Sequence, residues 1–156
     1  MKLRVMATIC MAVFTFCMLK YFEPVEAIEY AISGNLSISS ISLNSGVTSL
    51  ELEEGELKTP ATIIGSFKRH ENSTLLIGHA RTVFKDLKNA HIGDIVSLDG
   101  VDYRIYKSQI SLKSSVNMKD LLAARETDTL ILMTCYGDIY SNGDASHRLI
   151  IFASKV

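Results

Sequence analysis

The sequence predicts an all-β domain, folded as a closed or nearly closed barrel of about eight short strands with one or two short helices. Short runs rich in β-branched and aromatic residues recur along the chain, separated by polar segments that contain glycine. Asp99-Gly100 lies between two such runs, which is the strongest local signal for a β-hairpin. A helical pattern is confined to residues 83–87 and the segment that follows Asn117.

Residues 1–27 are predicted to be an export signal rather than part of the domain. Lys2 and Arg4 precede an apolar run over residues 5–19, which is the order found in signal peptides. Two outcomes stay open: cleavage after Ala27, which ends a small-x-small pattern, or retention as a signal-anchor in the membrane. Both put the domain outside the cytoplasm, either at the outer face of the cell membrane or secreted.

The first half of the domain is expected to consist of short strands and turns. Residues 28–35 form a linker, and the domain covers residues 36–156. Apolar residues alternate over residues 36–43 with one slip at Ser39-Ser40, as in a bulged strand. The next expected segments are a turn at 44–46, a strand at 47–50, an acidic loop at 51–56, a strand at 61–64 and a polar loop at 65–72.

The second half contains the clearest strand signals. Asn117 is the expected N-cap of a short helix, with Asp120 three residues later. The other expected elements are a strand at 73–77 that ends at Gly78, a helical turn at 83–87, a hairpin of 95–98 with 101–106, and strands at 129–134 and 149–153.

Composition excludes several classes of function. The chain has 16 basic and 17 acidic residues, a net charge of -1, so nothing in it predicts a nucleic-acid partner. Of the three cysteines, Cys10 and Cys17 lie in the signal segment, which excludes a disulfide framework or a cysteine metal cluster in the domain. The loop from Glu51 to Glu56 is expected to be solvated, and a weak calcium site is its alternative. No other cofactor is expected.

The remaining cysteine, Cys135, ends one apolar strand, and Arg148 begins the next. If these strands are neighbours, the thiol and the guanidinium face each other, and a thiolate can be stabilised there. The alternative is an inert, buried thiol. Among the histidines, His79 ranks first as proton partner because it follows a strand and a glycine, and His147 ranks second because strand alternation turns it away from Arg148. We read His70 and His91 as surface residues.

Several motifs in one unbroken order resemble those of the sortases, the cysteine transpeptidases of bacterial cell surfaces. The resemblance covers residues 36–156, and its most specific element is Leu132-Met-Thr-Cys135. The other motifs are Leu76-Ile-Gly-His79, Phe84-Lys-Asp-Leu87, Ile92-Gly-Asp-Ile95, Tyr103-Arg-Ile-Tyr106 and Arg148-Leu-Ile-Ile-Phe-Ala153. The sequence departs from the family at Ala80, where an arginine often follows the histidine, and this leaves the sortase class and the sorting motif open.

The resemblance implies a sortase-type barrel with Cys135 as nucleophile, His79 as general acid and base, and Arg148 beside the reacting carbonyl. Thr134 is a candidate substrate-binding residue that supports the site. The implied reaction cleaves the sorting signal of an exported protein through a thioacyl-enzyme. An amine acceptor, such as a peptidoglycan stem peptide or a pilin lysine, then takes the acyl group.

Two rivals remain at this level. Peptidoglycan L,D-transpeptidases have a histidine shortly before their cysteine, whereas Met133-Thr134 precede Cys135 here. A non-catalytic extracytoplasmic barrel that binds peptide or cell-wall polymer would leave Cys135 buried and unreactive. The reactivity of the thiol separates this rival from an enzyme.

Overall fold

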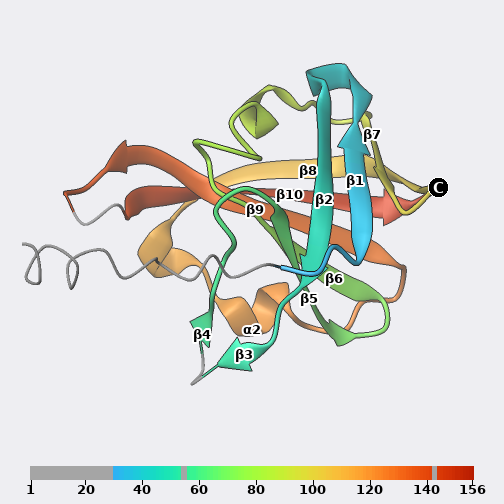
Figure 1. The fold of residues 1–156 in the computed structure, drawn as a ribbon, viewed down its shortest axis with the longest axis horizontal. Coiled ribbons are helices and arrows are strands. Elements are labelled where there is room, and N and C mark those ends of the chain that lie inside the picture. The colour runs from blue at the N-terminus through green and yellow to red at the C-terminus, as the bar shows by residue number, and fades with distance from the viewer. Residues whose placement is uncertain (1–29, 54–55, 142–143) are drawn as a thin grey trace, which may run out of the picture.

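The computed structural model of the chain describes residues 30–53, 56–141 and 144–156. Eight strands in these residues form a closed barrel with the neighbour order β1-β2-β5-β6-β9-β10-β8-β7 (Figure 1). They are β1 (Gly34–Ile38), β2 (Leu43–Ser49), β5 (Ile64–His70), β6 (Ser73–Ile77), β7 (Ile95–Leu98), β8 (Val101–Leu112), β9 (Thr129–Ile139) and β10 (Ala145–Lys155). The predicted eight-stranded barrel is confirmed, whereas the predicted signal of residues 1–27 lies outside the described residues.

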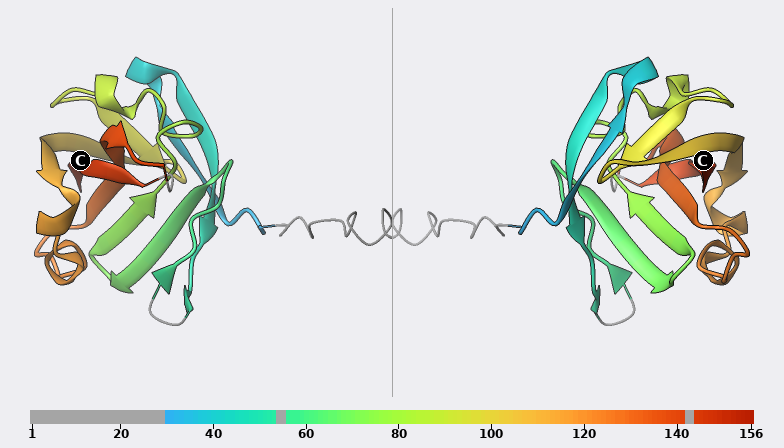
Figure 2. Two further views of the ribbon diagram at one scale, coloured as in Figure 1. Left: turned by 90° about the vertical axis from the view of Figure 1, so that its left-hand side faces the viewer. Right: turned by 90° about the vertical axis from the view of Figure 1, so that its right-hand side faces the viewer.

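Two small elements lie beside the barrel on the same side of it (Figures 1 and 2). One is a two-stranded ribbon of β3 (Leu52–Glu53) and β4 (Glu56–Leu57), and the other is the helix α2 (Met118–Leu121). The Asn117 side chain caps α2 by accepting a hydrogen bond from the backbone N–H of Lys119 at 3.0 Å, as the sequence predicts. Three 3₁₀ turns complete the fold: η1 (Ser39–Ile41), η2 (Leu87–Asn89) and η3 (Lys113–Ser115).

The segments 129–134 of β9 and 149–153 of β10 are buried on both faces, which explains why their sequences are almost continuously apolar. Successive side chains of a strand point to opposite faces. Leu130 and Leu132 of β9 therefore pack in the barrel interior, whereas Ile131 and Met133 pack in a second cluster on the outer face. This second cluster also contains Leu121 of α2, so the helix covers the outer face of the two strands.

The predicted hairpin is present. Asp99 (φ 52°) and Gly100 (φ 80°) connect β7 to β8 with positive φ at both positions, as a type I′ turn requires. Strand β8 continues to Leu112, well past the predicted end at residue 106, because its second half pairs with β10.

Two predictions for the first half of the domain are wrong. The slip at Ser39-Ser40 is not a bulge but the tight reversal η1, which ends at Ser42 with φ 53° and lets β1 pair with β2. The predicted turn at 44–46 belongs to β2, where these residues pair with β1. Short polar side chains produced both errors, because exposed strand positions and turns use the same residues.

Two further segments differ from expectation. Residues 65–72 were predicted to form a loop, but β5 runs to His70, and its polar second half is exposed at the end of the barrel. Residues 83–87 form hydrogen-bonded turns that lead into η2 rather than a helical turn. Phe84 and Leu87 of this segment are fully buried in the barrel core, so burial, and not helix formation, explains the apolar spacing.

Candidate active site

Strand β9 presents Cys135 on the outer face of the barrel. Alternation puts Cys135 on the same face as Met133, while Thr134 between them points inward and is buried. The Cys135 side chain is half-buried and free. The sequence predicts that Cys135 ends its strand, and this is wrong, because β9 continues to Ile139. The thiol is therefore held by paired backbone on both sides and not by a loop.

Arg148 lies directly opposite Cys135 in the antiparallel pair of β9 and β10. Side chains of such a pair share a face and have Cβ atoms about 5 Å apart. Arg148 is the fourth residue of β10, so paired backbone fixes its position as well. The expected juxtaposition of thiol and guanidinium thus follows from the strand register.

The Arg148 guanidinium is held by three acceptors. Nη1 donates to the carbonyls of Ala145 (3.1 Å) and His147 (3.0 Å), and Nη2 donates to Oδ1 of Asp144 at 2.9 Å. Asp144 also pairs with Lys113, and hydrogen bonds from these two cations hold the pKa of its carboxyl well below the usual range. The Nε–H and the second N–H of Nη2 remain for another acceptor.

His79 reaches the site through the parallel pairing of β6 with β9. Ile77 of β6 pairs with Met133 of β9, and His79, two residues after Ile77, lines the same groove as Cys135, two residues after Met133. Two hydrogen bonds hold the strands together there: Gly78 N–H donates to the Met133 carbonyl (3.4 Å), and Thr134 Oγ1 donates to the Gly78 carbonyl (2.7 Å). Neighbouring strands lie about 4.8 Å apart, so His79 stands beside the cysteine strand.

The His79 imidazole is exposed, and its Nε2 lies 3.4 Å from the carbonyl oxygen of Thr59. A proton on Nε2 donates to this carbonyl and leaves Nδ1 as the nitrogen available to the thiol. This contact is compatible with a His79 tautomer that can act as a base.

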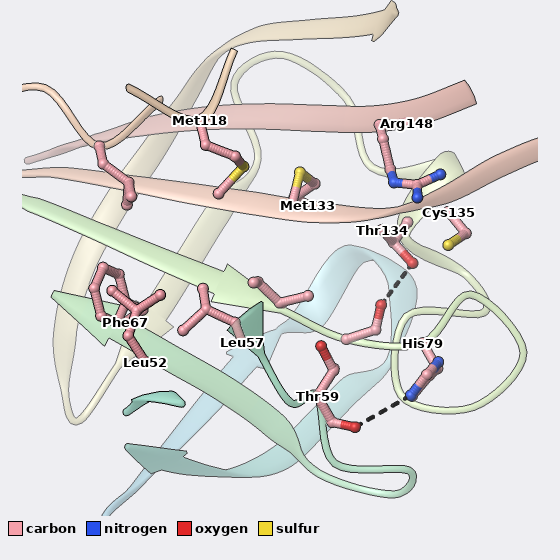
Figure 3. A pocket seen from close by; sticks show the side chains of 13 residues that line it. Leu52, Leu57, Thr59, Phe67, His79, Met118, Met133, Thr134, Cys135 and Arg148 are labelled. Atoms are coloured by element: carbon pink, nitrogen blue, oxygen red, sulfur yellow. Dashed lines mark hydrogen bonds between the residues drawn. The ribbon is translucent and has the colours of Figure 1, made fainter. Parts of the chain in front are cut away.

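The three predicted residues line one groove of about 340 Å³ (Figure 3). Most of its remaining lining is apolar and comes from β3, β4, β5, β9, α2 and the residue that follows α2: Leu52, Leu57, Phe67, Met133, Met118 and Leu122. Figure 3 shows Leu52, Leu57 and Phe67 on one side of the groove and Cys135 and His79 toward the other. A half-buried thiol flanked by an imidazole and a guanidinium is an arrangement suited to nucleophilic catalysis.

The second-ranked histidine is not part of this groove. His147 pairs with Tyr136, and its Nδ1 lies 2.7 Å from Oγ of Ser146, on the face opposite Arg148. His70 and His91 are exposed, on β5 and in the turn before β7, as expected for surface residues. Within the described part of the chain, His79 is the histidine that shares a groove with Cys135.

Thr134 supports the site from within. Its side chain is 4 % exposed, and its hydroxyl donates to the Gly78 carbonyl, next to His79. The geometry therefore favours a positioning role for this hydroxyl over a hydrogen bond to substrate.

Two parts of the site have no clear signal in the sequence: Asp144 and the two-stranded ribbon of β3 and β4. Asp144 lies in a polar, glycine-containing loop, where nothing distinguishes it from a solvated carboxylate. Leu52 and Leu57 stand among glutamates, and their alternation extends over too few residues to indicate strands. Within the described residues no group of three or more His, Cys, Asp or Glu side chains could hold a metal ion, and two residues of the suggested calcium loop, 54–55, lie outside them.

Comparison with known structures defines the class of the fold as a sortase-type barrel. Sortase A of Listeria monocytogenes has a TM-score of 0.63 and 12 % identity, over 81 % of this chain and 88 % of that one. A lid mutant of Corynebacterium diphtheriae sortase A has a TM-score of 0.64 and 20 % identity, over 85 % and 74 %. Sortase C from Clostridium perfringens SM101 has a TM-score of 0.61 and 18 % identity, over 81 % and 70 %.

The sortase domain model matches residues 36–156, and the chain belongs to the sortase family. A comparison with curated proteins gave no match. Among the described residues, no helix has the length and apolar character needed to cross a membrane.

Proposed function

We propose that this sortase is a cysteine transpeptidase that cleaves the sorting signal of an exported protein and transfers the acyl group to an amine at the cell surface. The observation that carries the proposal is the convergence of three side chains on one apolar groove: Cys135 from β9, Arg148 from β10 and His79 from the segment that follows β6. An apolar groove beside a nucleophile suits an extended peptide with apolar side chains.

The first half-reaction forms a thioester. The Cys135 thiolate attacks the carbonyl carbon of the scissile amide, and the oxygen takes up negative charge. The remaining N–H donors of Arg148 stabilise this oxyanion, an effect that can contribute several kcal/mol. The C–N bond then breaks, and the imidazolium of His79 gives its proton to the departing amine.

The second half-reaction uses the same groups in reverse. An acceptor amine attacks the thioester carbonyl, His79 takes the proton from the amine, and Cys135 leaves as the thiolate. A new amide is released. Water in place of the amine gives a carboxylic acid, so the enzyme hydrolyses its donor when no acceptor is present.

The experiment that tests this proposal is mass spectrometry of the purified domain with a library of donor pentapeptides. We expect an acyl adduct on Cys135, abolished in Cys135→Ala and reduced by about 10²-fold or more in His79→Ala. His147→Ala is the matched control and should retain most of the rate. An equal loss in both histidine variants would contradict the choice of base.

The non-catalytic alternative gives a different result in the same experiment. A barrel that only binds peptide or cell-wall polymer forms no adduct, and its thiol reacts slowly with iodoacetamide in the native state. Localisation belongs to the proposal as well: we expect the domain at the outer face of the membrane, held by residues 1–27, or secreted. Fractionation of cells with an antibody to the domain tests this expectation.

A further inference from the structure

Cys135 borders a second cavity in addition to the apolar groove. This cavity has a volume of about 180 Å³ and shares only Thr134 and Cys135 with the groove. Tyr136 and Leu149, the next residues of the two strands, line it, and so does the segment over residues 80–88 that follows His79. Cys135 therefore lines both the groove and the second cavity.

The second cavity differs from the groove in charge. Its lining includes Arg81, Lys85 and Lys88 but no acidic side chain. All three cations are exposed, and within the described residues none of them forms a salt bridge. In the groove, by contrast, the Arg148 charge is compensated by Asp144, and most of the surface is apolar. The two spaces thus suit different molecules.

We propose that the second cavity is the acceptor subsite, and that it selects an amine whose own molecule has a carboxylate close to the amino group. This inference rests on the proposed transpeptidase function. Ammonium and guanidinium groups bind carboxylates through charge-assisted hydrogen bonds. With the carboxylate on the cations of residues 81–88, the amino group of a short acceptor points toward Cys135, at the shared border of the two spaces.

The order of the reaction agrees with this assignment. The donor peptide fills the apolar groove while the thioester forms, so the acceptor needs a different route to the same carbonyl carbon. Ala80 of the cavity directly follows His79, the residue that would take the proton from the incoming amine. The cavity is thus next to both groups that the second half-reaction uses.

The test compares two acceptors that differ in one charge, glycylglycine and glycylglycine amide, at equal concentrations of free amine with one donor peptide. We expect the wild-type enzyme to have a lower KM for glycylglycine. In the variant Lys85→Glu/Lys88→Glu the preference should fall by about two- to fivefold per lysine, the scale of an exposed ion pair. The same preference should weaken with added salt, which screens exposed charges.

The control Lys68→Glu/Lys155→Glu makes the same change in net charge at exposed positions that do not line the cavity. It should keep the wild-type preference, and both double variants should form the thioester and hydrolyse the donor at wild-type rates. Equal KM values for the two acceptors in the wild type, or an unchanged preference in the cavity variant, would overturn the acceptor subsite alone. Absence of any thioester in the wild type would overturn the transpeptidase function with it.

Discussion

At the scale of single residues, the guanidinium of Arg148 is aimed by its neighbours rather than by its own strand alone. Asp144 binds Nη2, and two backbone carbonyls bind Nη1, which leaves donors on one side for substrate. Asp144 touches no reacting atom in the proposed mechanism, so its role is positioning. Its ion pair with Lys113 extends this support to η3, which directly follows β8.

Asp144→Asn should reduce kcat/KM for thioester formation by about fivefold, because a partly buried ion pair that restrains Arg148 becomes a weaker neutral contact. The pKa of Asp144 is lowered, so its carboxylate is ionised above the ordinary aspartate range and is lost only when pH falls through the depressed value. The defect should therefore be the same at pH 5 and pH 8. Asp138→Asn, an exposed change in the same hairpin, is the control, and an equal loss there would contradict the positioning role.

The hydroxyl of Thr134 gives a second prediction at this scale. Thr134→Val keeps the shape but removes the donor to the Gly78 carbonyl, and it should lower the free energy of unfolding by about 1–3 kcal/mol. Thr134→Val should also change the pH profile of thioester formation, which a purely structural loss would leave unchanged. Thr134→Ser keeps the hydroxyl and should restore the wild-type profile. Urea unfolding and acylation rates across pH 5–9 measure both effects.

At the scale of elements, the site depends on how β6 ends. The strand delivers His79 to the level of Cys135 because its register with β9 is fixed up to Gly78. A Cβ added at Gly78 would lie 2.6 Å from Cγ2 of Val83 and 2.7 Å from Cδ2 of Phe84. The glycine therefore allows the segment after the histidine to pack closely over the end of the strand.

Gly78→Ala should displace His79 and overpack the barrel core at a cost of about 1–3 kcal/mol. We expect a large loss of kcat with a small change in donor KM, since the apolar groove stays intact. Gly46→Ala is the control, because its nearest neighbour is the flexible Ile32 side chain at 3.2 Å. Wild-type kcat in Gly78→Ala would contradict the close-packing argument.

Some elements of the barrel could be predicted from the sequence, and others could not. The hairpin at Asp99-Gly100, the cap at Asn117 and the strands around Cys135 were predictable, since local turn chemistry and continuous apolar runs specify them. Strand β5 and the reversal at η1 were not, because exposed strand residues resemble loop residues. The role of Asp144 could not be predicted from the sequence, since its partners are Lys113 of η3, which is distant in the chain, and Arg148 of β10.

At the scale of the whole molecule, the barrel is closed around one core, and contacts between distant segments hold its ends. Tyr103 of β8 is 6 % exposed, and its hydroxyl donates to Oδ2 of Asp128, just before β9, at 3.0 Å. Burial, the hydrogen bond to Asp128 and the negative charge of that carboxylate raise the pKa of Tyr103 to about 12. The folded barrel therefore binds the phenolic proton more tightly than the unfolded chain does.

This contact makes the stability of the barrel depend on alkaline pH. Stability from the neutral phenol is complete below the unfolded pKa of about 10 and is lost as pH rises toward about 12. At pH 8, Tyr103→Phe should lower the free energy of unfolding by about 1 kcal/mol, because the substitution removes the hydrogen bond. At pH 11 this deficit relative to the wild type should be smaller. Urea unfolding at both pH values measures the difference, with Tyr140→Phe at an exposed site as control. A deficit of equal size at both pH values would mean that Tyr103 ionises in the folded barrel as readily as in the unfolded chain.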